Sequence, residues 1–288
     1  MLKYIKLLRV KQWIKNLFVF AGIIFSLHFT DFNNIILTSK IFVTFCMIAS
    51  AVYIINDSID VEKDRNHPVN CKRPIASGEI GINEAILISI LLLISSLISA
   101  YMINTKLFYI ILSYFIMNLL YTFKLKQIVI IDVFIIAIGF VLRVLAGTVT
   151  INVNPSHWLL LCTFLLSLFL GFAKRRHELT LMGTDNEKSR VVLSKYSTYF
   201  LDQMLAVITP SVFLSYVLYT VDSETIAKYH GKQLIYTTPF VIYGIFRYQY
   251  LVYEKKEGNP SKIVFQDISL IVNVVVWLVL FLYLAEMN

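Results

Sequence analysis

The segment Asn56–Asp64 carries side chains that could hold a metal–diphosphate complex. Asn56, Asp60 and Asp64 are four residues apart, so on one α-helix they lie on the same face, about 6 Å apart per step. Two carboxylates at this spacing repel, and a divalent cation over them would relieve the repulsion. Oxygen ligands suit Mg²⁺, which usually completes its shell with water and substrate phosphates. We predict that these three residues bind Mg²⁺ with Asp57 in support; the alternative is a solvated helix end with ordinary acidic residues.

The basic residues that follow this acidic row could bind the outer oxygens of a diphosphate. Arg65, Lys72 and Arg73 come shortly after Asp64. A metal on the bridging oxygens, with arginine and lysine on the outer ones, holds a diphosphate and stabilises it as a leaving group. Taken alone, the three residues could equally reflect the excess of Lys and Arg in cytoplasmic loops of membrane proteins. Beside the acidic row, we favour phosphate binding.

The elements that must position these side chains are apolar enough to cross a membrane. Hydrophobic residues make up 58% of the 288 positions, and the mean hydropathy is +0.71. The apolar runs are long and nearly free of charge, which indicates a bilayer as solvent. A net charge of +8 could suggest nucleic acid, but the basic residues lie in short loops rather than on one amphipathic face, so we expect no nucleic-acid partner. Three widely spaced cysteines match no metal site, and we expect free thiols at Cys46, Cys71 and Cys162.

The predicted fold class is all-α, a polytopic membrane protein with nine transmembrane helices. A span needs about 20 mostly apolar residues. We expect one domain over residues 1–288, because no repeat or linker interrupts the chain. The first and eighth spans are interrupted by Lys15, Asn16 and Arg247. The predicted spans are 14–29, 38–56, 83–103, 107–123, 128–148, 157–173, 203–221, 234–250 and 267–285.

The distribution of Lys and Arg predicts how the chain is oriented. Most of the 26 basic residues fall on one set of loops, and such loops are cytoplasmic. The N-terminus and the long loops are therefore predicted to face the cytoplasm, and the C-terminus the outside. We expect a multi-pass protein of the bacterial cytoplasmic (inner) membrane. The long polar loops on this side, which are expected to carry the function, are 57–82, 174–202 and 251–266.

The string NDSIDVEKDRNHPVNCKRPIASG, residues 56–78, resembles the first Asp-rich motif of the UbiA superfamily of intramembrane prenyltransferases. That motif reads N-D-x-x-D-x-x-x-D and is followed by R-P-x-x-S-G. The resemblance implies a nine-helix bundle with cytoplasmic active-site loops and a Mg²⁺-dependent diphosphate site. It covers nearly the whole chain.

Further segments are similar to one branch of the superfamily, the decaprenyl-phosphate phosphoribosyltransferases. That branch moves a 5-phosphoribosyl group from phosphoribosyl diphosphate (PRPP) to a polyprenyl phosphate and releases diphosphate. The resemblance therefore implies PRPP and a polyprenyl phosphate lipid as partners. The segments are LLRVKQWIKN (Leu7–Asn16), GFVLRVLAG (Gly139–Gly147) and RYQYL (Arg247–Leu251), with Asn259-Pro260 and Asp267.

The loop after the sixth span departs from the aromatic prenyltransferase branches. Those branches carry a second Asp-rich motif there, whereas this chain reads FAKRRHEL at residues 172–179. A phosphoribosyltransferase of this type must bind three phosphate groups: the diphosphate, the ribose 5-phosphate and the lipid phosphate. Arginine is well suited to binding phosphate. The residues expected to serve it are Lys174, Arg175, Arg176 and Glu178.

Arg143 is predicted to be functional because an ionisable side chain inside a span is expensive. It could bind a phosphate deep in a cavity or pair with an acid such as Asp132 or Glu178; a purely structural ion pair is the alternative. Gly139 and Gly147 flank it and could let helices approach closely.

The lipid phosphate needs cations of its own at the membrane surface, and the alternative for each of them is a snorkelling anchor. The candidates are Lys11, Lys15, Lys124 and Lys126. Together, the predicted catalytic residues are Asp57, Asp60, Asp64, Lys15 and Arg143. The predicted substrate-binding residues are Lys11, Asn16, Arg65, Lys72, Arg73, Tyr121, Lys124, Lys126, Lys174, Arg175, Arg176, Glu178 and Arg247.

Two other functions compete with phosphoribosyl transfer. An aromatic-substrate polyprenyltransferase of quinone or haem biosynthesis would use a prenyl diphosphate and an aromatic acceptor, and the missing second Asp motif argues against it. The other alternative is a transporter or a structural membrane protein, and it lacks support because the sequence shows no inverted repeat or paired broken helices. The sequence leaves the chain length of the lipid and homo-oligomerisation open.

Overall fold

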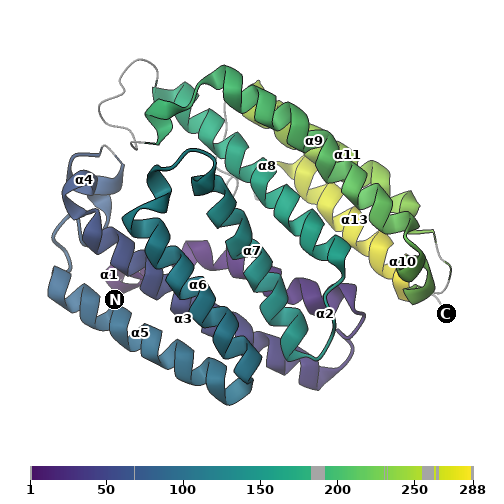
Figure 1. The fold of residues 1–288 in the computed structure, drawn as a ribbon, viewed down its shortest axis with the longest axis horizontal. Helices are drawn as coiled ribbons and strands as arrows, with labels where there is room; N and C mark the ends of the chain where they lie inside the picture. The colour runs from purple at the N-terminus through teal and green to yellow at the C-terminus, as the bar shows by residue number, and fades with distance from the viewer. Residues whose placement is uncertain are drawn as a thin grey trace. The chain divides into compact units, whose positions relative to one another are not determined.

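The computed structural model describes residues 2–67, 69–182, 192–229, 231, 233–254, 263 and 266–286, which contain helices and no strand (Figure 1). Seven of the helices in this part of the chain are long and apolar enough to cross a membrane. The predictions of an all-α fold and of a multi-pass membrane protein are therefore confirmed. These helices are α3 (Phe32–Ile59), α5 (Ile82–Ile103), α6 (Thr105–Phe123), α7 (Ile131–Thr150), α8 (His157–Met182), α9 (Thr198–Val221) and α13 (Ile268–Glu286).

The other two predicted spans are built from shorter pieces, so the count of nine is not confirmed. The first is a 3₁₀-helix, η1 (Val10–Phe20), followed by the short helix α2 (Ala21–Phe25). The eighth is η6 (Leu234–Thr237) followed by α11 (Thr238–Tyr253), whose 16 residues fall short of the length that usually spans a bilayer. The remaining short helices are α1 (Leu2–Leu7), α4 (Val61–Arg65), η2 (Asn70–Lys72), η3 (Leu125–Gln127), η5 (Leu193–Lys195) and α10 (Ser223–Lys228).

The chain falls into two compact units. The first unit holds the residues up to Ile128 and Ile138–Pro155, and the second holds Val129–Ala137 and the residues from Ser156 onward. Helix α7 thus gives its first turns to the second unit and the rest to the first. The prediction of a single domain stays a prediction.

Helix α3 is the central element of the first unit. It packs against α5, α6 and η1 (Figure 1). Its apolar residues form a core with α6, and Phe45 and Tyr114 meet edge to face with ring centroids 5.5 Å apart. Hydroxyl groups also join the helices, since Ser89 on α5 donates a hydrogen bond to the carbonyl of Ala51 on α3. This packing fixes the end of α3, where the acidic residues begin.

The 3₁₀-helix η1 is unusually long at 11 residues, because runs beyond three or four residues are uncommon. It follows Arg9, whose backbone is left-handed at φ 51°. Helix α7 approaches η1 so closely that a Cβ on Gly147 would lie 1.9 Å from the carbonyl oxygen of Val19. The predicted role of Gly147 is therefore confirmed. At Gly139, an added Cβ would meet nothing nearer than 3.4 Å, so that glycine is not required for close approach.

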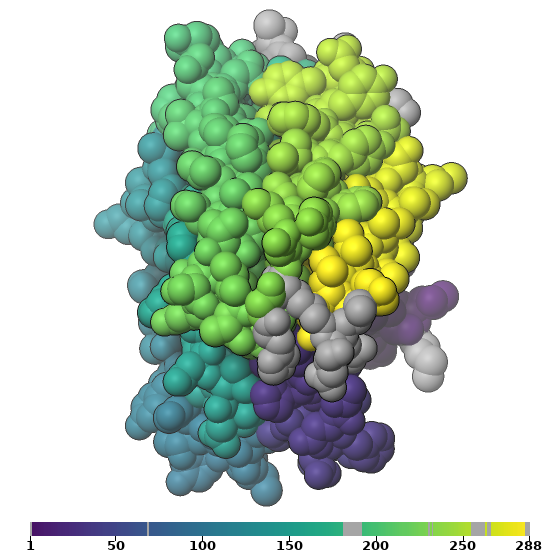
Figure 2. Space-filling view, turned by 90° about the vertical axis from the view of Figure 1, so that its right-hand side faces the viewer, coloured from purple at the N-terminus to yellow at the C-terminus, as the bar shows by residue number. Residues whose placement is uncertain are grey.

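The second unit is built on α8, α9, α11 and α13. Helix α8 packs along α9, and α11 packs against α9 and α13. Figure 2 shows α9, α11 and α13, in green to yellow, side by side on one face. The core includes Phe169 and Tyr248, whose ring centroids are 5.4 Å apart. This core positions the polar end of α8, where the predicted basic loop begins.

Candidate active site

The acidic residues lie at a break between two helices, not on one continuous helix face as predicted. Helix α3 ends at Ile59, α4 begins at Val61, and Asp60 between them has φ −89° and ψ 11°. The backbone N–H groups of Asp60 and Asp64 still donate to the carbonyls four residues earlier, at 3.0 and 2.9 Å. The four-residue spacing is kept, but the carboxylates have different partners. Seven side chains form what we call the acidic-motif site: Arg9, Asn56, Asp57, Asp60, Asp64, Arg73 and Lys126.

Lys126 binds the first half of this site. Its ammonium lies 2.6 Å from Asp60 Oδ2 and 3.5 Å from Asn56 Oδ1. The lysine and Asp60 side chains are 19% and 18% exposed, so the pair remains accessible. Two oxygens that converge on one cation form the kind of site predicted for a metal ion. Lys126, a predicted substrate-binding residue, is thus placed beside the acidic row.

Two arginines bind the second half. Asp57 is buried, and its carboxylate accepts hydrogen bonds from Arg9 Nε at 3.1 Å, from Arg9 Nη2 and from Arg73 Nη1 at 3.0 Å. Arg73 Nη1 also donates to Asp64, and the Asn70 amide donates to the same carboxylate at 3.0 Å. Asp57 and Asp64 are therefore joined through one guanidinium. Arg9 was not predicted, although it lies within the LLRVKQWIKN segment.

The oxygen donors of this site fit a hard cation such as Mg²⁺. Asn56 and Asp60 already share the Lys126 ammonium, which shows that their oxygens can approach one positive charge. In the described residues, however, no group of three or more His, Cys, Asp or Glu side chains is placed to hold a metal. Asp64 binds Arg73 and Asn70 instead. A metal held by all three predicted ligands would require Lys126 and Arg73 to change partners.

The other predicted residues of the first unit are not among the seven side chains of the acidic-motif site. Arg65 is exposed and pairs with Glu62 at 2.7 Å. Lys11, Lys72 and Lys124 are exposed, whereas Lys15 and Tyr121 are half-buried. Their predicted roles stay predictions.

Arg143 lies in α7 and is buried, with neutral partners. It donates to Asn16 Oδ1 at 2.8 Å, to the carbonyl of Gly139 at 2.6 Å and to the Tyr114 hydroxyl at 2.9 Å. Its guanidinium carbon also lies 4.9 to 5.6 Å from the ring centroids of Tyr114, Phe45 and Phe140. In the described part of the chain it forms no ion pair, so the suggested partnership with Asp132 or Glu178 is wrong. Arg143 instead ties η1 and α6 to α7.

Asp132 and Glu178 bind Arg175 in the second unit. Arg175 Nε donates to Asp132 at 2.8 Å, and Nη1 donates to Glu178 at 2.7 Å. Tyr196 donates to the second oxygen of Asp132 at 2.7 Å and accepts from the backbone N–H of Ile130. Arg175 and Asp132 are 3% and 0% exposed, so this pair is sealed, whereas the Glu178 side chain is 24% exposed. We call Asp132, Arg175, Glu178 and Tyr196 the Arg175 cluster.

Burial, and then the hydrogen bond to the Asp132 carboxylate, raise the pKa of the Tyr196 hydroxyl above its ordinary value. Tyr196 is therefore a neutral donor at working pH. The phenol therefore keeps the proton that it donates to the Asp132 carboxylate.

Two further ion pairs place the remaining predicted residues of the second unit. Arg176 donates to Asp202 at 2.5 Å and stacks 3.7 Å over the Tyr253 ring. Arg247 makes two hydrogen bonds to Asp267, at 3.1 and 2.8 Å. Lys174 approaches Glu178 more loosely, at 3.7 Å. The Asn259-Pro260 segment of the predicted resemblance lies outside the described residues.

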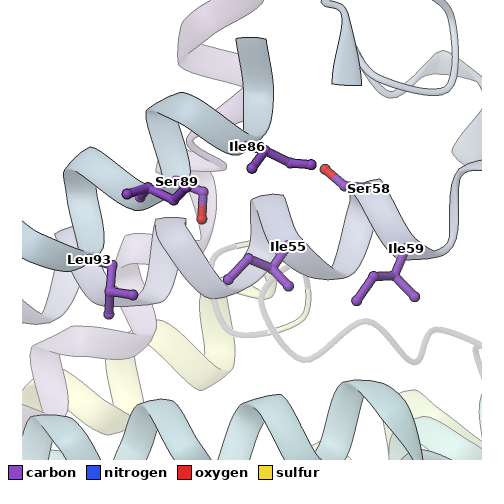
Figure 3. Close-up of a pocket in the computed structure, with 7 residues that line it drawn as sticks. Ile55, Ser58, Ile59, Ile86, Ser89 and Leu93 are labelled. Carbon is purple, nitrogen blue, oxygen red and sulfur yellow. The ribbon is translucent and has the colours of Figure 1, made fainter. Parts of the chain in front are cut away.

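An apolar recess lies beside the acidic-motif site, between α3 and α5 (Figure 3). Its volume is about 270 Å³, and its lining includes Ile55, Ile86 and Leu93. Its two hydroxyls are already used, since Ser58 donates to Ile54 O and Ser89 to Ala51 O. A recess without available polar groups is unsuited to a phosphate.

The seven membrane-length helices of the described residues define a polytopic membrane protein, and carboxylates and cations gather at the end of one of them, α3. The chain belongs to the UbiA prenyltransferase family, whose family model matches residues 16–271. It is 31% identical to the decaprenyl-phosphate phosphoribosyltransferase of Mycolicibacterium smegmatis, over 95% of this chain and 89% of the relative. It is 33% identical to the enzyme of the same name from Corynebacterium glutamicum, over 95% and 83%. The predicted resemblance to this family and branch is confirmed.

The fold agrees with that assignment. A UbiA homolog from Archaeoglobus fulgidus, solved with GPP and Mg²⁺ bound, superposes with a TM-score of 0.74 at 19% identity. The match covers 99% of this chain and 100% of the homolog.

Proposed function

We propose that this protein is a phosphoribosyltransferase that moves 5-phosphoribosyl from PRPP to a polyprenyl phosphate of the decaprenyl type and releases diphosphate. The observation that carries the proposal is the similarity to decaprenyl-phosphate phosphoribosyltransferases over nearly the full length of both chains. The chemistry of the acidic-motif site supports it, because carboxylates and cations together suit a metal-bound diphosphate.

The reaction forms one bond and breaks one. An oxygen of the lipid phosphate attacks C1 of the ribose, while the bond between C1 and the diphosphate oxygen breaks and its electron pair leaves with the diphosphate. The transition state has oxocarbenium character, by analogy with other glycosyl transfers. No protein nucleophile or general base is needed, because the attacking phosphate is already anionic at pH 7. Positioning and charge stabilisation supply the catalysis.

The acidic-motif site would receive the leaving diphosphate. Asn56 and Asp60, with Asp64, would hold Mg²⁺, which neutralises the charge that develops on the departing oxygens. Lys126 would leave Asp60, Arg73 would leave Asp64 while staying bound to Asp57, and both would donate to the outer phosphate oxygens. Such an exchange is feasible because the side chains of Lys126 and Arg73 are 19% and 24% exposed and can therefore be reached by a ligand.

The other predicted residues have separate tasks in this proposal. Lys11, Lys15 and Lys124 would bind the lipid phosphate at the membrane surface, with Tyr121 beside Lys124. The basic residues of the second unit that keep accessible surface remain candidates for binding phosphate; these are Lys174, Arg176 and Arg247. We assign Arg175 and Glu178 to positioning, because Arg175 is sealed among carboxylates. Arg143 and Asn16 would hold η1, which carries Lys11 and Lys15.

The proposed location is the bacterial cytoplasmic membrane, with the N-terminus and the acidic-motif site on the cytoplasmic side. PRPP is water-soluble, so its site must face the aqueous compartment where it is made. The bias of Lys and Arg supports this orientation.

Diphosphate release tests the function directly. Purified protein with Mg²⁺, PRPP and a polyprenyl phosphate should release diphosphate and form a phosphoribosylated lipid, and EDTA should stop both. Release only with a prenyl diphosphate and an aromatic acid would overturn the assignment in favour of an aromatic prenyltransferase. Full activity in EDTA would remove the metal from the proposal.

A further inference from the structure

Arg9 has an uncommon backbone for an arginine. Its φ of 51° and ψ of 45° lie in the left-handed region, which costs a non-glycine residue about 1 kcal/mol or more. Such strain persists only where surrounding contacts hold it, and it is concentrated at functional sites. The strained residue stands at the start of η1.

Three contacts hold the Arg9 side chain in one orientation. Nε and Nη2 both donate to the Asp57 carboxylate, which is the two-point geometry that a guanidinium forms best. The guanidinium carbon lies 5.0 Å from the centroid of the Tyr53 ring. Both partners belong to α3, so the end of that helix determines where Arg9 points.

The Asp57 carboxylate is occupied by guanidinium groups. One oxygen accepts from Arg9 and from Arg73, and the other accepts from Arg9. Asp57 is 4% exposed, whereas the Asp60 side chain is 18% exposed and is paired with Lys126. A buried carboxylate that already accepts three charged hydrogen bonds is poorly placed to receive a metal ion.

Both arginines retain donors for another ligand. In the described part of the chain their contacts use Nε and Nη2 of Arg9 and Nη1 of Arg73, leaving Nη1 of Arg9 and Nε and Nη2 of Arg73. The two side chains are 22% and 24% exposed, so these donors can be reached. Two planar guanidiniums held by one carboxylate present a rigid double fork that matches the oxygens of a diphosphate.

We propose that Arg9 is a diphosphate-binding residue, and that Asp57 is the positioning residue that holds Arg9 and Arg73 as a pair rather than a metal ligand. This inference rests on the proposed function. It separates Asp57 from Asp60 within one motif: Asp60 serves the metal, and Asp57 serves the arginines.

Binding of inorganic diphosphate, measured by calorimetry on the full-length protein at a series of Mn²⁺ concentrations, tests the inference. Arg9→Gly relieves the left-handed strain while removing the guanidinium, so the variant should fold. Losing hydrogen bonds to a charged ligand should weaken diphosphate binding about tenfold to a hundredfold. Arg9→Lys should recover part of the loss. Lys6→Gln removes an exposed charge from the same N-terminal segment and should bind as the wild type does.

The Asp57 variant distinguishes positioning from metal binding. The Mn²⁺ midpoint is the Mn²⁺ concentration at which diphosphate binding is half-maximal. Asp57→Asn should weaken diphosphate binding but keep the wild-type midpoint, whereas Asp60→Asn should raise the midpoint at least tenfold. Wild-type affinity in Arg9→Gly, or an Asp57→Asn midpoint shifted like that of Asp60→Asn, would overturn the inference and leave the proposed function standing. A wild-type protein that binds no diphosphate would overturn both the inference and the proposed function.

Discussion

The acidic-motif site and the Arg175 cluster use the same chemistry in different surroundings. Each pairs carboxylates with cations at hydrogen-bonding distance. Asp60 and Lys126 keep nearly a fifth of their side-chain surface exposed, whereas Arg175 and Asp132 keep almost none. An accessible pair can exchange partners with an incoming ligand, but a sealed pair cannot do so without exposing a charge to an apolar interior. We therefore expect substitutions to alter function at the first group and stability at the second.

The largest expected effect tests the functional half of this comparison. Asp60→Asn removes the carboxylate that would serve the metal, and the rate of diphosphate release should fall about 10²- to 10³-fold or more. The unfolding temperature should stay within a few degrees of the wild-type value, because Asp60 is accessible.

Glu62→Gln is the matched control, since Glu62 lies in the same segment and pairs with Arg65 in an exposed position. It should leave the rate unchanged. An equal loss of rate in both variants would show that the segment responds to total charge rather than to the placement of Asp60.

The next effect tests the structural half. Asp132→Asn removes the fully buried carboxylate partner of Arg175 and leaves only the partly exposed Glu178 to balance the buried guanidinium, which should destabilise the fold by about 3–5 kcal/mol. The free energy of unfolding can be compared by denaturant titration in detergent. Arg65→Met, which breaks an exposed pair, should show no measurable change.

The double variant Asp132→Asn with Arg175→Met sharpens this result. Removing both charges should cost less than the sum of the single substitutions, because no unpaired charge is left buried. Additive losses would contradict the account of a sealed ion pair.

The smallest effect concerns Tyr196. Tyr196→Phe removes two buried hydrogen bonds and should cost about 1–3 kcal/mol. The pKa of this hydroxyl is raised in the folded state, so its contribution is full below the unfolded-state pKa of about 10 and is lost as pH rises through the folded value. Stability of the wild type should therefore fall above about pH 10 more steeply than stability of Tyr196→Phe. If the stabilities of the two proteins fell in parallel with rising pH, this prediction would be contradicted.

The sequence predicted the helices and the chemistry of the site better than the pairings within it. The seven long spans follow from apolar runs of bilayer length, although α3 begins at Phe32 rather than at residue 38, capped by Asp31. The interruptions at Lys15 and Asn16 fall in a predicted span that is largely a 3₁₀-helix rather than an α-helix. The acidic row and Arg73 were predicted, and the structure brings them together.

Partners far apart in the chain could not be predicted. Arg9 and Asp57 are 48 residues apart, and Lys126 and Asp60 are 66 apart, so only tertiary packing decides which cation meets which carboxylate. The same holds for Arg143, where a single charge in a span suggested an acidic partner. Neutral acceptors and aromatic rings surround it instead.

The winding of η1 has a consequence for its length. A 3₁₀-helix rises about 2.0 Å per residue against 1.5 Å in an α-helix, so these 11 residues reach about 5 Å further than an α-helix would. Rewinding η1 as an α-helix would shorten it and would also turn successive side chains by 100° instead of 120°. Trp13, Asn16 and Val19, which align every third residue, would then leave Ser50, Arg143 and Gly147 in turn. These three contacts therefore depend on the three-residue repeat of the 3₁₀-helix.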